Sequence, residues 1–171
     1  LVGSEMCIRD SGYLGRGLFP LIEALCTLGK VTVVVPGNNY SAGSHAITLD
    51  KSFLTRKITA FRRSKWKNYL LNRIGGRFYI VKGSSADCVR LAYMSLSQGK
   101  IDLVASGIND GSNLGTDIIY SATVAAAREA AIEGIASIAI SQVGMTGNRD
   151  FSRSKLVAYS VCKKILEGCR H

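Results

Sequence analysis

A stretch rich in glycine, serine and amide side chains, at positions 106–115, has the composition of a ligand-binding loop. Its glycines let the backbone approach a ligand closely, and the amide oxygen of Asn109 is a suitable ligand for a hard divalent cation. An ordinary turn-rich loop uses the same residue types. The position favours function, because the stretch follows an expected buried strand at 101–105, and ligands bind beyond the carboxyl ends of parallel strands.

A second group of polar side chains opens an alanine-rich helical segment at 121–132. The unpaired N–H groups and the dipole of a helix N-terminus attract anions, and Ser121 and Thr123 add two hydroxyls. A phosphate would suit this place. Ordinary N-capping by Ser121 is the alternative interpretation.

A third polar stretch, at 36–48, follows the β-branched run at 31–35. Its Ser41 could ligate a metal ion or a phosphate, and His45 could donate a proton or contact a phosphate. A single histidine can equally have a structural role.

The elements that must position these residues alternate between strand and helix. Strands are expected at 31–35, 78–81, 101–105 and 136–141, and helices at 15–28, 84–96, 121–132 and 151–166. Gly29 ends the first helix, and Ser84 or Ser85 can cap the second. This alternation predicts right-handed crossovers and a three-layer α/β fold, with a mainly parallel sheet between helices on both faces.

The bulk composition fits one domain, with 171 residues of which 47% are hydrophobic and 20% charged. The five cysteines are odd in number and contain no C-x-x-C pair, so we expect reduced core residues and no zinc site. No apolar run approaches the roughly 20 residues that a membrane span needs. We therefore expect a soluble, cytoplasmic protein.

The formal charge of +10 comes mostly from one insert at 50–77. Nine Lys or Arg residues and no Asp or Glu lie between positions 51 and 77. Four aromatic residues are interleaved with them and could form a surface for phosphates and bases, namely Phe53, Phe61, Trp66 and Tyr69. We favour the alternative, a solvated excursion whose apolar residues dock on the domain.

Five segments, taken in order, resemble the successive signature blocks of the survival protein E (SurE) family. They lie at 31–36, 41–48, 83–89, 106–109 and 120–129, and the resemblance covers roughly residues 12–142. No single block is decisive, but five in register are highly specific.

The resemblance implies a Rossmann-like α/β/α domain that hydrolyses nucleoside monophosphates with a divalent cation, Mg²⁺ or Mn²⁺. The family holds its metal with two consecutive aspartates before a glycine, with a serine after the second strand, and with the asparagine of a Ser-Gly-x-Asn loop. The serine and the asparagine correspond to Ser41 and Asn109.

The aspartate pair is where this sequence departs from the family. The family block reads Asn-Asp-Asp-Gly, and the corresponding residues here are Arg9, Asp10, Ser11 and Gly12. Asp10 takes the first aspartate position, as metal ligand and catalytic residue, and Ser11 replaces the second. His45 is the other catalytic candidate, and phosphate contacts are assigned to Gly12, Asn113, Ser121 and Thr123.

Both ends of the chain differ from the family pattern. Positions 1–9 lack the β-branched run that should form the first strand, and we expect no well-formed strand there. We interpret residues 1–11 as foreign sequence, similar to translated sequencing-adapter text. Family members also continue beyond the last helix, so we expect truncation at both ends and a homodimer or homotetramer in the full-length protein.

The leading hypothesis is a 5'/3'-nucleotidase, a phosphomonoester hydrolase related to acid phosphatases, in which the lost aspartate can leave this fragment inactive. The alternative is a catalytically impaired protein that binds nucleotides, or that binds RNA or polyphosphate through the basic insert. A dinucleotide oxidoreductase is disfavoured, because the glycines at 12, 15 and 17 have the wrong spacing.

Overall fold

A computed structural model of the chain describes residues 4–8, 15–38, 43–49, 52, 54–62, 64–97, 100–143 and 150–169. Six strands form one sheet in the order β3-β4-β2-β1-β5-β6. All neighbouring strands are parallel except β3 and β4. The strands are β1 Ser4–Ile8, β2 Lys30–Pro36, β3 Thr55–Lys57, β4 Phe78–Val81, β5 Leu103–Asp110 and β6 Ser137–Gln142.

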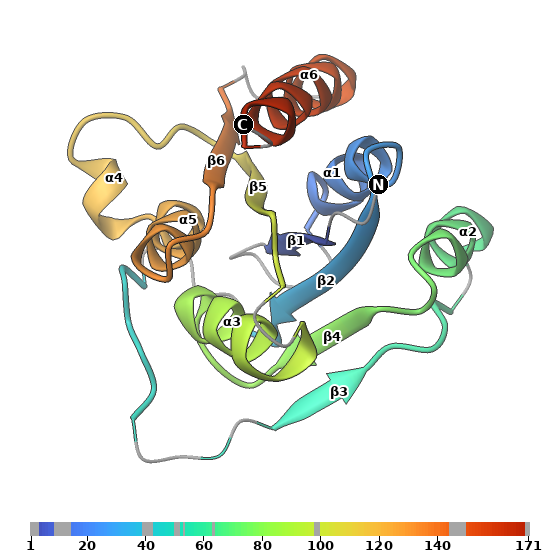
Figure 1. Ribbon diagram of the computed structural model, residues 1–171, viewed down its shortest axis with the longest axis horizontal. Helices are drawn as coiled ribbons and strands as arrows, with labels where there is room; N and C mark the ends of the chain where they lie inside the picture. Colours follow the sequence, from blue (N-terminus) through green and yellow to red (C-terminus); the bar gives the residue numbers. More distant parts are fainter. Residues whose placement is uncertain are drawn as a thin grey trace.

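Helices cover both faces of this sheet. Figure 1 shows α1, α2 and α6 on one side and α3 and α5 on the other. The three-layer α/β/α fold is therefore confirmed. The helices are α1 Leu18–Leu25, α2 Lys65–Arg73, α3 Ser85–Leu91 with a π-helical continuation at Ala92–Leu96, α4 Asp117–Tyr120, α5 Ala122–Ile132 and α6 Ser152–Gly168. Among the described residues, no helix is both long and apolar enough to cross a bilayer.

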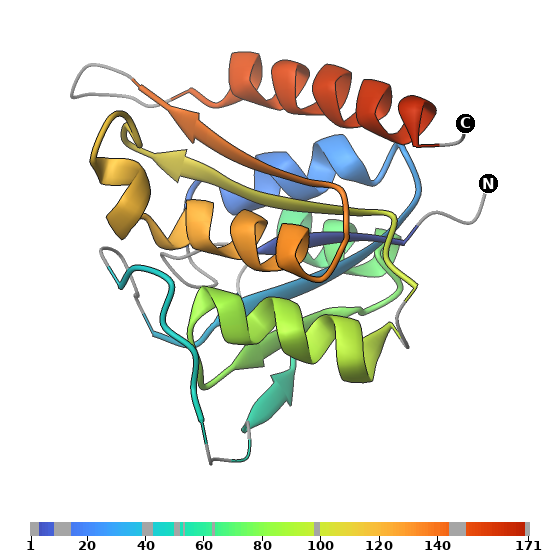
Figure 2. The same cartoon turned by 60° about the vertical axis from the view of Figure 1, so that its left-hand side comes forward.

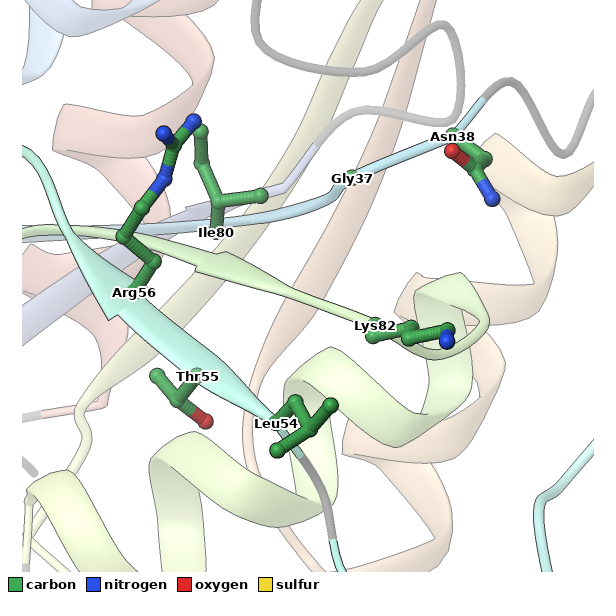
Figure 3. A pocket seen from close by; sticks show the side chains of 7 residues that line it. All are labelled: Gly37, Asn38, Leu54, Thr55, Arg56, Ile80 and Lys82. Atoms are coloured by element: carbon green, nitrogen blue, oxygen red, sulfur yellow. The ribbon is translucent and has the colours of Figure 1, made fainter.

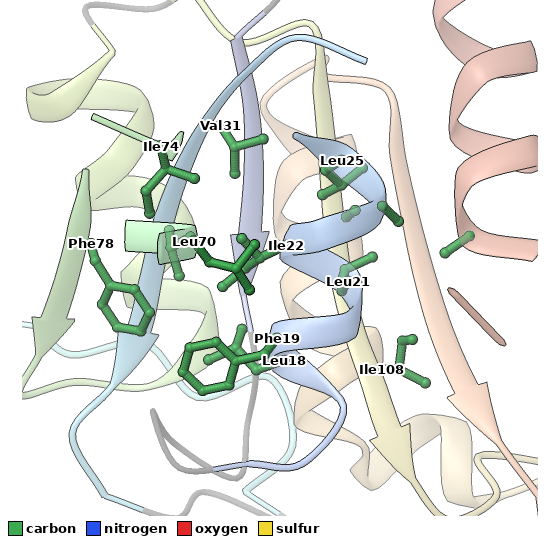
Figure 4. Close-up of a cluster of buried hydrophobic side chains, with 14 of the residues drawn as sticks. Leu18, Phe19, Leu21, Ile22, Leu25, Val31, Leu70, Ile74, Phe78 and Ile108 are labelled. Carbon is green, nitrogen blue, oxygen red and sulfur yellow. The ribbon is translucent and has the colours of Figure 1, made fainter. Parts of the chain in front are cut away.

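Strand β2 is apolar on both sides because it separates two hydrophobic cores. Val33 and Val35 point into the core under α1, and Val34 points into the core under α3 and α5. In the core under α1, Leu18, Leu21 and Leu25 are fully buried (Figure 4). A continuous apolar run is the pattern of a parallel strand covered on both faces, so this strand is confirmed as predicted.

The basic insert docks on the domain through its apolar residues. Helix α2 buries Leu70 and Leu71, and Ser64 caps it by accepting a hydrogen bond from the backbone N–H of Lys67 at 3.3 Å. Phe61 packs edge-on against Phe19, with ring centroids 5.4 Å apart. The docking of the insert is therefore confirmed.

The first strand corrects the sequence-based expectation. Positions 4–8 form β1 in the middle of the sheet, paired with β2 on one side and β5 on the other. Two neighbouring strands supply backbone partners for the whole segment, and this tertiary context outweighs the lack of β-branched residues. The expectation of no well-formed strand is wrong for Ser4–Ile8.

Strand β5 is also longer than predicted. The expected loop at 106–115 begins instead with five strand residues, and Asn109 and Asp110 pair with β6. The pairing shifts register between Ser106 and Asn109. Glycine, serine and asparagine favour a turn locally, but pairing with the distant β6 extends the strand.

Two of the described cysteines, Cys88 and Cys162, are buried in the core, whereas Cys26 is half-buried and Cys169 is exposed. None of these four cysteines forms a disulfide. Burial raises the pKa of the Cys88 thiol well above its usual value, and the neighbouring Asp87 carboxylate raises it further. Cys88 is therefore a protonated, unreactive thiol.

Close contact between β5 and β6 requires glycine at position 107. A Cβ atom there would lie 2.3 Å from the carbonyl oxygen of Ile140, and φ is +131°. We expect Gly107→Ala to lower the free energy of unfolding by at least about 2 kcal/mol, because overpacking and backbone strain act together. Urea unfolding measures this difference.

The matched control is Gly134→Ala, where φ is +75° but nothing lies within 4 Å of the added Cβ. Only the left-handed backbone opposes this substitution, so we expect a loss of about 1 kcal/mol. Equal losses in the two variants would show that the contact with Ile140 is not the cause.

Candidate active site

The candidate site lies at the edge of the sheet where the parallel strands end. Figure 2 shows the carboxyl ends of β5 and β6 on the side opposite to the two chain termini, with α4 and the segment 43–49 beside them. Parallel strands bring the residues that follow them to one edge, so stretches far apart in the sequence meet there. Asp10, Ser41 and Gly12, three of the predicted site residues, lie outside the described residues.

Asn109 stands near the end of β5, opposite Ser141 of β6. Its side-chain Nδ2 donates a hydrogen bond to the carbonyl oxygen of Gly111 at 3.1 Å. This bond orients the amide and leaves Oδ1 as the atom that can ligate a cation, which is the donor type that Mg²⁺ and Mn²⁺ prefer. The predicted ligand therefore fits. Within the described ranges, no three His, Cys, Asp or Glu side chains group to hold a metal ion.

Asn113 lies in the segment between β5 and α4. Its Nδ2 donates to the Ser141 hydroxyl at 2.6 Å. One of the two amide hydrogens is thereby used, and the other remains able to reach an anion.

The N-terminus of α5 carries both predicted hydroxyls. Ser121 is the N-cap, and its Oγ accepts a hydrogen bond from the backbone N–H of Val124 at 3.2 Å. Thr123 is fully buried, and its Oγ1 has no hydrogen-bond partner in the described part of the chain. The N-capping interpretation of Ser121 is confirmed. An anion at the helix terminus would meet Ser121 and the backbone N–H groups before the more deeply buried Thr123.

The segment 43–49 is fixed against this helix terminus. The Ser44 backbone N–H donates to the carbonyl oxygen of Tyr120 at 3.0 Å, and the Ser44 hydroxyl donates to that of Ile119 at 3.0 Å. The segment that follows β2 therefore lies beside the start of α5. Two of the polar stretches singled out in the sequence, at 36–48 and at 121–132, therefore meet in the structure.

His45 is held by a buried carboxylate. Its Nε2 lies 2.6 Å from Oε2 of Glu129, a residue of α5 whose side chain is only 3% exposed. Arg90 of α3 lies on the other side of the same carboxylate, with its Nε 3.9 Å from Oε1. The structure brings His45 into contact with α5, through Glu129, a residue that the sequence analysis did not single out.

The capping box of α3 holds the other end of the segment. Asp87 accepts hydrogen bonds from the backbone N–H of Thr48 at 2.9 Å, from the Thr48 hydroxyl at 2.7 Å and from the backbone N–H of Ser84 at 2.8 Å. Ser84 in turn donates its hydroxyl hydrogen to the carbonyl oxygen of Ala46 at 2.6 Å. Capping by Ser84, one of the two predicted caps, is confirmed.

Glu129 and Asp87 carried a signal in the sequence. Glu129 lies among alanines in a helical run, Asp87 comes three residues after Ser84, and an acid that a helix buries needs a partner. That signal indicates a contact, but it does not say with which segment.

A hollow of about 220 Å³ lies beside the edge of the sheet, as Figure 3 shows. Two exposed cationic side chains, Arg56 and Lys82, flank it together with Asn38. Leu54 and Ile80 supply apolar walls. A space of this size, with cations at its rim, suits part of a nucleotide and is too small for a whole one.

Sequence comparison identifies the family. The family model of survival protein SurE matches residues 6–170. The chain belongs to the SurE family. Residues 4–8 supply a strand at the centre of the sheet, while the interpretation of residues 1–11 as foreign stays a prediction.

Two curated SurE relatives match nearly the whole chain. It is 41% identical over 158 residues to the 5'-nucleotidase SurE of Chlorobium phaeobacteroides, covering 92% of this chain and 56% of the relative. With the 5'-nucleotidase SurE of Aquifex aeolicus it is 40% identical over 163 residues, covering 94% of this chain and 58% of the relative.

The fold of a solved SurE structure agrees with these matches. The crystal structure of the SurE protein from Aquifex aeolicus superimposes with a TM-score of 0.81 at 40% identity, and covers 96% of this chain and 60% of that one. The chain thus spans about half the length of the curated SurE relatives it matches.

Proposed function

We propose that the protein hydrolyses nucleoside monophosphates to nucleoside and phosphate with the help of a divalent cation, as a 5'/3'-nucleotidase. The observation that carries the proposal is the convergence of the segments after β2 and β5 with the start of α5 at one edge of the sheet. The name 5'-nucleotidase SurE, borne by relatives at about 40% identity, supports the same reaction.

Asn109 would hold the cation through Oδ1, together with Asp10 and Ser41. A bound Mg²⁺ or Mn²⁺ supplies an electrophile that screens the charge of the phosphate and favours attack by water. The chain itself supplies the positions of these oxygens. The hydrogen bond from Asn109 to Gly111 holds the amide in the orientation needed.

The phosphate would be bound by N–H groups and hydroxyls. Ser121 and Thr123 at the start of α5, with Asn113 and Gly12, are the proposed contacts. Helix termini and hydrogen-bond donors that are already in place stabilise a phosphate without reorganisation. His45 is the proposed proton donor or additional phosphate contact.

The test is release of phosphate from nucleoside monophosphates, with and without added Mn²⁺. It compares the unmodified chain with a restored protein, which is this chain carrying Ser11→Asp and joined to the part of the Aquifex aeolicus relative that lies beyond the matched region. Mn²⁺-dependent release by the restored protein is expected. No release from any nucleotide by a folded restored protein would refute the proposed function.

A second candidate function is binding of a polyanion such as RNA or polyphosphate by a catalytically impaired protein. The exposed cations of the insert support it, since Arg56, Lys57, Arg62, Lys65 and Arg73 all face solvent. A binding constant for RNA or polyphosphate that falls steeply with salt, without turnover, would favour this candidate.

The proposal for the full-length protein also includes assembly into a homodimer or homotetramer and a cytoplasmic location.

Neutralising the insert separates binding from chemistry. We expect replacement of Arg62, Arg63, Lys65 and Lys67 by glutamine to raise KM for nucleotides in the restored protein. Turnover of p-nitrophenyl phosphate should remain, because long-range charge acts on binding rather than on the reacting group. The measurement is a steady-state comparison of both substrates at two salt concentrations.

The control for this variant replaces Lys163 and Lys164, two exposed lysines of α6, by glutamine. Unfolding must also be checked, because Lys67 lies over the ring of Phe19 with its Nζ 4.5 Å from the centroid. Loss of all p-nitrophenyl phosphate turnover in a folded insert variant would place the insert inside the active site.

A further inference from the structure

The contact between His45 and Glu129 is a buried interaction to which the proposed function assigns no role. The Glu129 side chain is 3% exposed and that of His45 17% exposed. Burying a carboxylate costs free energy unless the carboxylate is paired and hydrogen-bonded. The contact with His45 supplies this partner for Glu129.

The contact also decides which ring atom of His45 is free to act. Nε2 is the atom that lies 2.6 Å from the carboxylate, so its hydrogen is donated to Glu129. A histidine with one nitrogen fixed in this way has the other nitrogen, Nδ1, for exchange with a ligand. Chemistry at His45 therefore has to pass through Nδ1.

Neighbouring charges belong to the two helices that enclose the contact. Glu129 comes from α5, and α3 contributes Arg90, 3.9 Å from the Glu129 carboxylate. Asp87, also on α3, is occupied by Thr48 and Ser84. Arg90 and Thr48 also line a hollow of about 350 Å³ on this side.

We propose that Glu129 is a positioning residue, which fixes the imidazole of His45 through Nε2 so that Nδ1 donates the proton to the leaving alcohol. The proposal rests on the proposed function. It adds which ring nitrogen of His45 acts and which residue orients the ring. Neither follows from the sequence motif around His45.

The step balances as an ordinary hydrolysis. The oxygen of water bonds to phosphorus, the ester bond between phosphorus and oxygen breaks, and its electron pair passes to the leaving alcohol oxygen. That oxygen takes the proton from Nδ1 of the doubly protonated ring. The attacking water loses its proton to solvent, and the neutral ring, still bound to Glu129 through Nε2–H, regains a proton from solvent.

The decisive measurement compares two substrates in the restored protein. Adenosine monophosphate leaves a strongly basic alkoxide that needs a proton, whereas p-nitrophenyl phosphate leaves a weakly basic phenolate that does not. We expect Glu129→Ala to lower kcat for adenosine monophosphate by about 10- to 100-fold, within the usual range of general acid catalysis, with little change in KM. The kcat for p-nitrophenyl phosphate should fall far less.

Conservative variants and a matched control complete this measurement. Glu129→Gln keeps an acceptor for Nε2–H and should recover part of the rate. The double variant His45→Gln with Glu129→Ala should be no slower than His45→Gln alone, since both act through one group. Glu133→Ala, at the C-cap of α5 and outside the site, should match the unsubstituted protein. Equal losses with both substrates would overturn the proposal and leave Glu129 a purely structural anchor.

A second readout needs no turnover. The chain has two histidines, so His171→Gln leaves His45 as the only imidazole in a ring ¹⁵N spectrum. Inorganic phosphate should shift the Nδ1 signal while Nε2 keeps its hydrogen-bonded signal, and Glu129→Gln should weaken this selectivity. A phosphate response at Nε2, or none from either nitrogen, would overturn the assignment of Nδ1 even if the protein proves to be a nucleotidase.

Discussion

Exchanging Ser11 for aspartate is expected to strengthen Mn²⁺ binding by about a thousandfold, which corresponds to about 4 kcal/mol. Hard divalent cations are held mainly by charged oxygens, and a serine hydroxyl supplies none. Isothermal titration of the unmodified chain and of the Ser11→Asp variant with Mn²⁺ measures the two dissociation constants. In the restored protein, turnover should rise in parallel, while the unrestored chain stays nearly inactive.

The matched control is Ser11→Asn, which has nearly the size of aspartate but no charge. It should bind Mn²⁺ only slightly more tightly than the serine. Because β1 is already paired on both sides, replacing the whole of residues 1–11 by a β-branched strand ending in Asn-Asp-Asp should add little to Ser11→Asp. If the unmodified chain hydrolyses nucleotides as fast as the restored protein, the assignment of Asp10 and its neighbour to the metal is wrong.

Asn109→Ala is expected to remove metal-stimulated turnover from the restored protein. Mutation of a residue that hydrogen-bonds to a metal ligand typically lowers metal affinity or activity by about 10- to 100-fold. Loss of a direct ligand should therefore lower the Mn²⁺-dependent rate by more than about 100-fold. Stability should change little, because the side chain is partly exposed and the hydrogen bond that it donates goes to a neighbouring carbonyl oxygen, that of Gly111. The measurement is the rate as a function of Mn²⁺ concentration, with thermal unfolding alongside.

Two variants make this experiment specific. Asn109→Asp supplies a charged oxygen at the same place and should retain the dependence on Mn²⁺. Asn72→Ala, an exposed residue of α2, should behave as the unsubstituted protein. An unchanged response to Mn²⁺ in Asn109→Ala would remove this residue from the metal site.

Ser41→Ala should also lower Mn²⁺-stimulated turnover, but by less than Asn109→Ala, because a neutral hydroxyl is a weak ligand.

The local pattern of the sequence was sufficient for the buried strands and for most helices. Strands β2 and β4 lie where continuous apolar runs predicted them, since a strand covered on both faces has no polar side. Helix α5 begins one residue after its predicted cap, because capping by Ser121 is a local interaction. Such features depend on neighbours in the chain and can be read from it.

Features that depend on distant partners were missed. Strand β1 forms because β2 and β5 flank it, and β5 extends through Asp110 because β6 lies beside it. The contact of His45 with Glu129 joins residues 84 positions apart. No periodicity or turn preference records such a pairing, so the sequence could nominate His45 but not its partner.

The capping box of α3 also holds the segment 43–49, and this affects how the two parts unfold locally. Asp87 accepts from Thr48 and Ser84 together, and Ser84 donates to Ala46, so the start of the helix and the segment lose their hydrogen bonds in one event. The amide hydrogens of Thr48, Ser84 and Asp87 should then exchange with deuterium at a common rate, as a single cooperative unit. The segment 43–49 would then open with the same free energy as the start of α3, although it is a loop at the edge of the candidate site.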